Sequence, residues 1–263
     1  MEYSWYLIIG VIAVGFFAGF INTLAGSGSL LTLPLLMFLG LDANVANGTN
    51  RIAILLQNIV GVSSFKQQKV FEWKQGLWFA IPAIVGSLIG ARIAINLNNH
   101  VMKITIACLL IVMFFLILFK PDSWIKGKDK KVSAKPGFLQ ILIFFLIGVY
   151  GGFIQAGVGF FLLAGLVLGA GLDIVKANAI KVLIILFYTP IALSVFIWYN
   201  QIDYKIGLIL AVGNMIGAFV GSRVAVSWGP KFVRIILLIT LCIAALQLLG
   251  VVEYIFSFID KIF

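Results

Sequence analysis

Two glycine-rich interruptions of otherwise apolar runs are the places where this sequence could hold a ligand. The first reads Gly-Ser-Gly-Ser over residues 26–29, and the second reads Gly-Val-Gly over residues 157–159. Where one helix breaks and another begins, backbone N–H groups are free and the positive end of a helix dipole is exposed, and both favour an anion. The interruptions therefore predict a small-anion site, with close helix packing as the alternative role of their glycines.

Polar side chains gather around both interruptions, whereas the apolar runs elsewhere carry few hydrogen-bonding groups. Asn47 and Asn178 stand near the starts of predicted spanning helices, where their amides either line a cavity or cap helix ends. Lys181 stands about one turn inside its helix, and a cation there marks a substrate path or ion pair, or reaches the interface along its stem. The predicted substrate-binding residues are Asn22, Ser27, Gly28, Ser29, Asn47, Thr49, Asn50, Gln155, Gly157, Gly159, Asn178, Lys181 and Tyr188.

The other residues with reactive side chains exclude several functions. All nine acids fall in predicted turns, in a central linker or near the termini. This placement argues against a cation transporter and leaves Asp42 or Asp173 as the acids that a coupling proton could use. His100 is the only histidine, and Cys108 and Cys242 have no partner at metal-site spacing. We therefore expect no metal site, no cofactor and no enzymatic activity.

These residues are embedded in a sequence with the composition of a membrane protein. Of its 263 residues, 62% are hydrophobic and 11% charged, whereas soluble domains carry about 25% charged residues. Long apolar runs such as 5–20 and 235–249 approach the roughly 20 residues of a spanning helix and lack the alternation of barrel strands. The net charge of +10 is concentrated in loops. It therefore indicates positive-inside topology rather than a nucleic-acid surface.

The sequence contains two copies of one unit. The segment GLDANVAN at 40–47 corresponds to GLDIVKAN at 171–178, and this offset of 131 holds without a gap over residues 26–105. About 22 of those 80 positions are identical in the second copy, including Asp, Asn, Lys and Arg. Apolar helices match one another by chance, but polar residues at one fixed offset indicate a true internal repeat.

The repeat predicts an all-α integral membrane protein with two inverted-topology repeats of about five helices each, and with short broken or re-entrant helices near the midplane. The first repeat covers residues 1–119, a basic linker covers 120–136, and the second repeat covers 137–263. The predicted helices are 5–24, 28–40, 45–66, 73–97 and 100–119, then 137–155, 159–170, 176–199, 204–227 and 231–249. The two short helices either tilt through the membrane or turn back within it.

The positions of Lys and Arg predict the orientation. If the units are inverted, the linker and the 66–74, 172–181 and 223–234 loops share one side, which then holds 14 of the 19 basic residues. Parallel units would divide these residues 11 to 8. Because basic loops remain in the cytoplasm, we predict a multi-pass membrane protein with a cytoplasmic linker and both termini outside.

Motifs in both units resemble a known family. In the second unit they are GGF at 151–153, AGVG at 156–159, GLD at 171–173, ANAIKV at 177–182, Tyr188, and the Gly217, Gly221 and Arg223 of a GxxxGxR pattern. In the first unit they are AGSG at 25–28, ANGTNR at 46–51, and the segment from Gly86 to Arg92. With these motifs the sequence resembles the sulfite exporter TauE/SafE family over nearly its whole length.

The resemblance implies a bacterial or archaeal inner-membrane transporter that exports sulfite, sulfonates such as sulfoacetate, or related small sulfur-containing anions. It also implies binding at the glycine breaks and at Asn47, Thr49, Asn50, Asn178 and Lys181. We accordingly expect a secondary transporter that exports such an anion by alternating access. A passive small-anion channel of the same fold and a binding module without transport are the alternatives. The expected partners are the small anion and the lipid bilayer, with no nucleic acid, and small-residue pairs such as Gly86 and Gly90 leave a homodimer open.

Overall fold

A computed structural model describes residues 5–70, 73–106, 108 and 136–248, and this part of the chain is helical without strands, as predicted. The helices are α1 (Trp5–Ala25), α2 (Ser29–Phe38), α3 (Ala43–Gln67), α4 (Trp73–Ile95), α6 (Phe138–Phe153), α7 (Val158–Ala164), the π-helix η1 (Gly165–Gly169), α8 (Ile174–Trp198) and α9 (Tyr204–Leu248). Residues 99–106 are also helical. Most of the predicted linker and the second half of the predicted helix 100–119 lie outside the described residues.

Four of these helices are long and apolar enough to cross a membrane, namely α1, α4, α8 and α9 as far as Trp228. Helix α3 has the same length as α8, but it carries Asn, Gln and Arg side chains that are mostly buried. The chain is therefore a multi-pass membrane protein in which the most polar long helix lies inside the bundle.

Backbone conformations recur at the offset of 131. Gly26 and Gly157 have φ values of 77° and 71°, and both lie where a long helix gives way to a short one. The later pair Gly40 and Gly171 also has positive φ, and so do the non-glycine residues at 69 and 200. Because positive φ is rare outside glycine, three such pairs at one offset mean that the two units share turn geometry as well as sequence.

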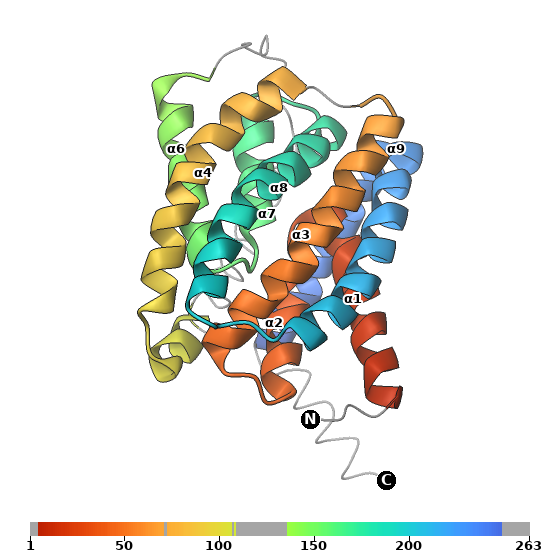
Figure 1. Ribbon diagram of the computed structural model, residues 1–263. Helices are drawn as coiled ribbons and strands as arrows, with labels where there is room; N and C mark the ends of the chain where they lie inside the picture. The colour runs from red at the N-terminus through yellow and green to blue at the C-terminus, as the bar shows by residue number, and fades with distance from the viewer. Residues whose placement is uncertain (1–4, 71–72, 107, 109–135, 249–263) are drawn as a thin grey trace.

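Each short helix folds back along the long helix before it. The side-chain amide of Gln140, near the start of α6, donates a hydrogen bond of 2.7 Å to the carbonyl of Gly169 at the end of η1. In the first unit, Leu36 of α2 packs in one apolar cluster with Val11 near the start of α1. The helices α1 and α2 form one hairpin and α6 and α7 form a second, and the two hairpins open at opposite ends of the molecule (Figure 1). Of the two sequence alternatives, the structure therefore has the turned-back one.

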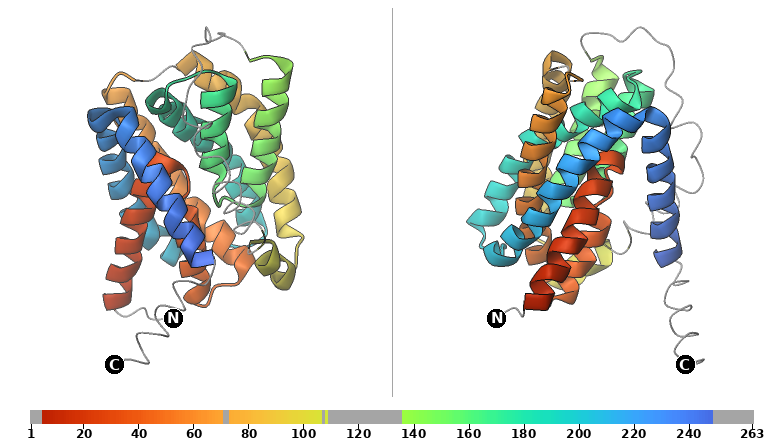
Figure 2. Two further views of the ribbon diagram at one scale, coloured as in Figure 1. Left: turned by 180° about the vertical axis from the view of Figure 1, so that it is seen from behind. Right: turned by 90° about the vertical axis from the view of Figure 1, so that its right-hand side faces the viewer.

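Helix α9 differs from the sequence prediction. We predicted separate helices at 204–227 and 231–249, whereas the structure has one helix of 45 residues, Tyr204–Leu248. Figure 2 shows that this helix bends sharply and that its last part runs back beside the bundle. The sequence has Gly-Pro at 229–230, and a proline lacks the N–H that would continue the helical ladder, so it bends a helix without ending it.

The two units exchange their outer helices. Helix α1 of the first unit packs on α9 of the second, and α6 of the second packs on α4 of the first, while α3 and α8 pack on each other in the centre. In Figure 1, α4, α8, α3 and the first part of α9 form the front layer, and Figure 2 shows α6, α7, α2 and α1 behind them.

Close backbone contacts hold these exchanged pairs. A Cβ atom added to Gly90 of α4 would lie 1.9 Å from the carbonyl oxygen of Val149 in α6. Its repeat counterpart Gly221 approaches Phe20 of α1 in the same way, with 3.0 Å to the carbonyl oxygen. The glycines that left a homodimer open thus pack helices within this chain.

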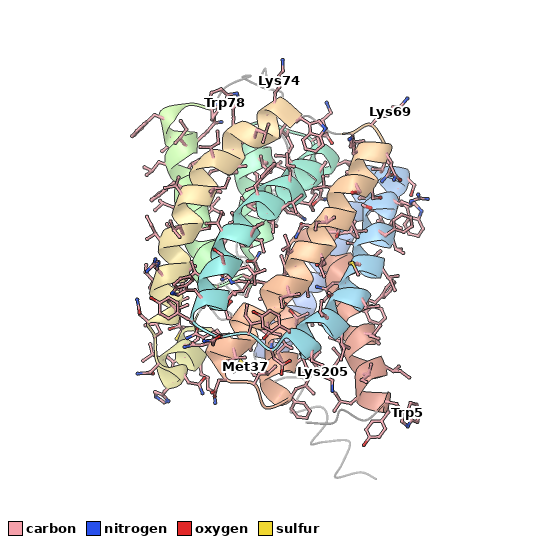
Figure 3. All side chains as sticks on the ribbon, in the orientation of Figure 1. Trp5, Met37, Lys69, Lys74, Trp78 and Lys205 are labelled. Atoms are coloured by element: carbon pink, nitrogen blue, oxygen red, sulfur yellow. The ribbon has the colours of Figure 1, made fainter. Side chains whose placement is uncertain are left out.

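Basic and aromatic side chains mark the two ends of the bundle. Lys69, Lys74 and Trp78 lie at one end, and Trp5 and Lys205 lie at the other (Figure 3). The turn between α3 and α4, the starts of α6 and α8 and the bend of α9 share the first of these ends (Figure 1). The described parts of the 66–74, 172–181 and 223–234 loops therefore lie at one end, while most of the linker predicted on the same side lies outside the described residues.

Candidate functional site

The two helix interruptions meet in the interior. A Cβ atom added to Gly26 would lie 2.3 Å from the carbonyl carbon of Gly159, and one added to Gly159 would lie 2.4 Å from the Cα atom of Gly26. Ser27 and Ser29 of the first interruption are buried, as are Gly157 and Gly159 of the second. The interruptions therefore face each other at the junction of the two units and are turned away from the outer surface.

Lys181 and Asn178 of α8 bind the end of α1. The ammonium of Lys181 donates hydrogen bonds to the carbonyls of Asn22 and Thr23, at 2.8 and 2.9 Å, and to the Asn178 side-chain oxygen at 2.7 Å. The Asn178 amide donates to the carbonyl of Leu24 at 3.1 Å. The last carbonyls of a helix have no partner within it and carry the negative end of its dipole. A side-chain cation and amide from the other unit supply that partner here.

Arg51 and Asn47 of α3 do the same for the end of α6. The Arg51 guanidinium donates to the carbonyls of Gly151 and Gly152 at 3.0 and 2.6 Å. The Asn47 amide donates to the carbonyl of Phe153 at 2.8 Å. The amides are repeat counterparts, but the cation stands three residues after the amide in α8 and four residues after it in α3. Each unit therefore caps the first helix of the other with an Asn and a cation.

This geometry bears on the predicted role of Lys181. An ammonium has three N–H donors, and all three are used by protein oxygens. Asn47 and Asn178 each use one side-chain N–H on a helix-end carbonyl. A substrate contact with Lys181 would have to replace one of its bonds, whereas each Asn amide has a second N–H. The binding roles of all three residues stay predictions, while their capping contacts are observed.

Both cations are buried without a carboxylate beside them. Arg51 and Lys181 have no exposed surface. The acids in the described part of the chain are Asp42, Asp173 and Asp203, and each lies directly before a helix, at the starts of α3, α8 and α9. Helix C-termini carry about half a negative charge each, which is less than the full positive charge of each cation. The interior around the two breaks therefore has a net positive charge.

A second pair of polar contacts lies between the capped helix ends. Gln57 of α3 and Tyr188 of α8 occupy matching repeat positions and are buried. The amides of Asn22 and Asn214 both donate to the Gln57 side-chain oxygen, at 3.2 and 3.3 Å. On the other side, the Gln155 amide donates to the hydroxyl of Tyr188 at 2.9 Å.

Gln155 links this second pair to the buried cation. Its side-chain oxygen accepts a hydrogen bond of 3.1 Å from the guanidinium of Arg51. One continuous chain of hydrogen bonds therefore runs from Arg51 through Gln155 to Tyr188. Among the predicted site residues, Asn22, Gln155 and Tyr188 thus lie with the breaks and the capping cations.

The remaining predicted site residues divide into two groups. Asn50 accepts a hydrogen bond from the hydroxyl of Thr32 at 2.7 Å and donates to the hydroxyl of Ser29 at 3.2 Å, which ties α2 to α3. Thr49 accepts from the backbone N–H of Asp203 at 2.8 Å, at the start of α9. Ser29 and Asn50 therefore belong to the first break, whereas Thr49 holds the turn before α9.

Several buried polar atoms near the breaks have no hydrogen-bond partner within the described part of the chain. They are Ser27 Oγ, Arg51 Nε, Asn58 Oδ1, Thr189 Oγ1 and Asn214 Oδ1. Asn58 and Thr189 occupy matching repeat positions. A buried polar atom without a partner costs about 1–3 kcal/mol. Of these atoms Ser27 Oγ belongs to the first break itself, so it is available to a polar ligand there.

The sequence prediction missed Arg51, Gln57 and Asn214. Gln57 stands at the position that matches Tyr188, so the repeat offset could have found it, whereas Arg51 corresponds to Val182 and its only signal was its place beside the predicted Asn50. Asn214 has Ala83 as its counterpart and gave no such signal. Among the described residues there is no group of three or more His, Cys, Asp or Glu that could hold a metal ion.

Comparison with known proteins identifies the family. The family model "Sulfite exporter TauE/SafE" matches residues 11–248. The chain belongs to this family. The matched segment includes both helix interruptions, both capping cations and the second polar pair, so the TauE/SafE match covers the whole candidate site. No solved structure matches the chain significantly.

Relatives from three bacteria match this TauE/SafE protein along most of their length. "Probable membrane transporter protein ORF9" of Sinorhizobium sp is 28% identical over 249 residues, which is 95% of each chain. "Probable membrane transporter protein YfcA" of Escherichia coli strain K12 is 27% identical over 92% of this chain and 90% of its own. "Probable membrane transporter protein YjnA" of Bacillus subtilis is 22% identical over 92% and 99%. The chain is a membrane transporter of the TauE/SafE family and not an enzyme.

Proposed function

We propose that this transporter exports a small sulfur-containing anion, sulfite or an organosulfonate, across the inner membrane by alternating access. The family description names sulfite export. The observation that carries the proposal is the pair of buried cations, Arg51 and Lys181, with no carboxylate beside them in the described part of the chain. In a low-dielectric interior a net positive charge strongly favours binding of an anion over binding of a cation. Sulfite and sulfonates also offer several oxygens that accept hydrogen bonds from different directions.

The binding position in this proposal is the junction of the two breaks. The backbone N–H groups of Ser27 and Gly28, and those of Val158 and Gly159, make no hydrogen bond with other described residues. The unpartnered hydroxyl of Ser27 lies in the same segment. An anion there would accept hydrogen bonds from backbone donors of buried residues. The breaks are in backbone contact, so access requires the two units to move apart.

Alternating access follows from an inverted arrangement of the units, which is part of the proposal. The hairpins α1–α2 and α6–α7 open at opposite ends (Figure 1), and each is packed on the other unit. Rocking of one unit against the other would open the junction first to one end and then to the other. The end that carries Lys69 and Lys74 is the cytoplasmic one in this proposal, as positive-inside topology requires.

Reconstituted protein tests the proposal directly. Proteoliposomes loaded with sulfite are expected to release it with a rate that saturates as the internal sulfite concentration rises, and short sulfonates are expected to compete. Empty liposomes and liposomes loaded with a cationic solute of similar size are the controls. A flux that rises without saturation indicates the channel alternative, and an absence of protein-dependent flux for sulfite and sulfonates contradicts the proposal.

Ser27→Ala is expected to lower sulfite flux about tenfold, since one hydrogen bond to a charged ligand contributes about 1.5 kcal/mol. The unfolding temperature should stay the same or rise, because the substitution removes a buried hydroxyl that has no partner in the described structure. Thr23→Ala is the matched control, since its hydroxyl already donates to the carbonyl of Gly19 at 2.9 Å. Equal flux in both variants would show that Ser27 does not contact the anion.

A further inference from the structure

A groove on the outer face of the bundle lies between α4 and α8. It has a volume of about 370 Å³ and is lined by Leu88, Arg92, Ser194, Val195, Trp198 and Tyr199. A second hollow of about 390 Å³ along α4 shares Leu88 and Arg92 and adds Ile89, Ile93 and Asn96. Because two lining residues are common to both, the hollows adjoin and form one groove with Arg92 between its two parts.

The charge of this groove is uncompensated. Arg92 is exposed, and within the described residues its guanidinium makes no hydrogen bond and no ion pair. None of the lining residues is acidic. The repeat counterpart, Arg223, lies instead over the ring of Phe219 at 4.3 Å. The position of Phe219 corresponds to Leu88 in the groove, so Arg92 lacks the aromatic ring that holds its counterpart.

The groove lies where a membrane interface is expected. Both walls belong to candidate spans, Trp73–Ile95 and Ile174–Trp198, and Arg92 stands one turn before the first of these ends. Trp198 and Tyr199 stand at the end of the second, and Trp198 is 82% exposed. Aromatic rings and cations at helix ends lie at headgroup level. Leu88 and Val195 lie about one turn further in, at the level of acyl chains.

We propose that this groove binds one anionic phospholipid, with its phosphate on Arg92 and an acyl chain along Leu88 and Val195. An arginine holds phosphate oxygens through paired N–H donors, and the apolar walls continue inward from it. A soluble anion would use Arg92 but would leave the apolar part of the groove empty. The groove is separate from the helix breaks, so this site does not depend on the proposed transport function.

Native mass spectrometry of the purified full chain tests this site with phosphatidylglycerol and phosphatidylethanolamine added separately. The wild-type chain is expected to retain one phosphatidylglycerol in preference to the zwitterionic lipid. Arg92→Gln should reduce that retention at least about fivefold, which corresponds to roughly 1 kcal/mol. Arg223→Gln, the matched repeat position, should not reduce it.

A second pair of variants separates the groove from simple charge attraction. Ser194→Trp fills the groove and leaves Arg92 in place, and it should reduce retention as Arg92→Gln does. Ser63→Trp is the control, since Ser63 is the exposed repeat counterpart, and both hydroxyls donate to a carbonyl of their own helix at 2.8 Å. Equal retention by Arg92→Gln and wild type, equal loss in either control, or displacement by inorganic phosphate would overturn the proposal.

Discussion

Lys181→Met is expected to lower the free energy of unfolding by about 3 kcal/mol and to abolish sulfite flux. Methionine fills a similar volume but donates no hydrogen bond, so the carbonyls of Asn22 and Thr23 and the side-chain oxygen of Asn178 lose the donor that they share. Buried acceptors without donors cost about 1–3 kcal/mol each, partly relieved by local relaxation. The unfolding temperature in detergent should fall by about 10 °C for a chain of this size.

Two further variants separate hydrogen bonding from charge at this position. Lys181→Gln keeps N–H donors without the charge, so it should recover part of the lost stability and leave sulfite flux low. Lys74→Met removes an exposed lysine at the end of the bundle (Figure 3), and it should change the free energy of unfolding by less than about 0.5 kcal/mol. If Lys181→Gln restores full flux, the positive charge is not needed for the anion.

Gly26→Ala is expected to prevent most of the protein from folding, because Gly26 combines a close backbone contact with a positive φ. The added Cβ would lie 2.3 Å from the backbone of Gly159, and φ at this position is +77°. Backbone atoms cannot turn aside as a side chain can, so overpacking of about 1–3 kcal/mol adds to about 1–2 kcal/mol for the left-handed conformation. The protein should yield little folded material, and what folds should carry no sulfite flux. Size-exclusion profiles and proteoliposome flux measure the two effects.

Substitutions at three other glycines separate the cost of the close backbone contact from the cost of the positive φ. Gly159→Ala meets the same contact, 2.4 Å from the Cα of Gly26, without positive φ. Gly40→Ala has φ of +90° but nothing within 4 Å, so it should cost only about 1–2 kcal/mol. Gly10→Ala has neither a close contact nor a positive φ, so it should leave the free energy of unfolding unchanged or raise it slightly. A Gly159→Ala variant with normal stability and flux would mean that the breaks need not approach each other.

Most of the correct predictions about the fold came from the internal repeat. The offset of 131 correctly predicted both interruptions, both Asp residues before the central helices, and the turns at Gly40 and Gly171. It could do so because the conformation of a turn depends on one or two local residues, such as Gly or Asp. The bend in α9 was predicted as a gap, since a Gly-Pro pair signals a helix end as readily as a kink. Local sequence does not distinguish these outcomes.

The candidate site was predicted less completely than the fold. The sequence located the polar residues around the breaks, but it could not show that α3 and α8 each cap the first helix of the other unit. These contacts join residues 100 or more positions apart, such as Arg51 with Gly151 and Lys181 with Asn22. The role of Arg51 depends on the partner that the fold supplies, and no local pattern contains that partner.

The exchange of caps between units has a consequence for how the chain is made. A chain that enters the membrane from its N-terminus inserts α1 long before Lys181 is synthesised, and 159 residues separate this lysine from Asn22. During that interval the end of α1 has neither its cation nor its amide. The first half of the protein must therefore stay in the membrane as an incompletely packed bundle until α8 is inserted. Water, lipid headgroups or the insertion machinery must supply partners for the exposed carbonyls during that time.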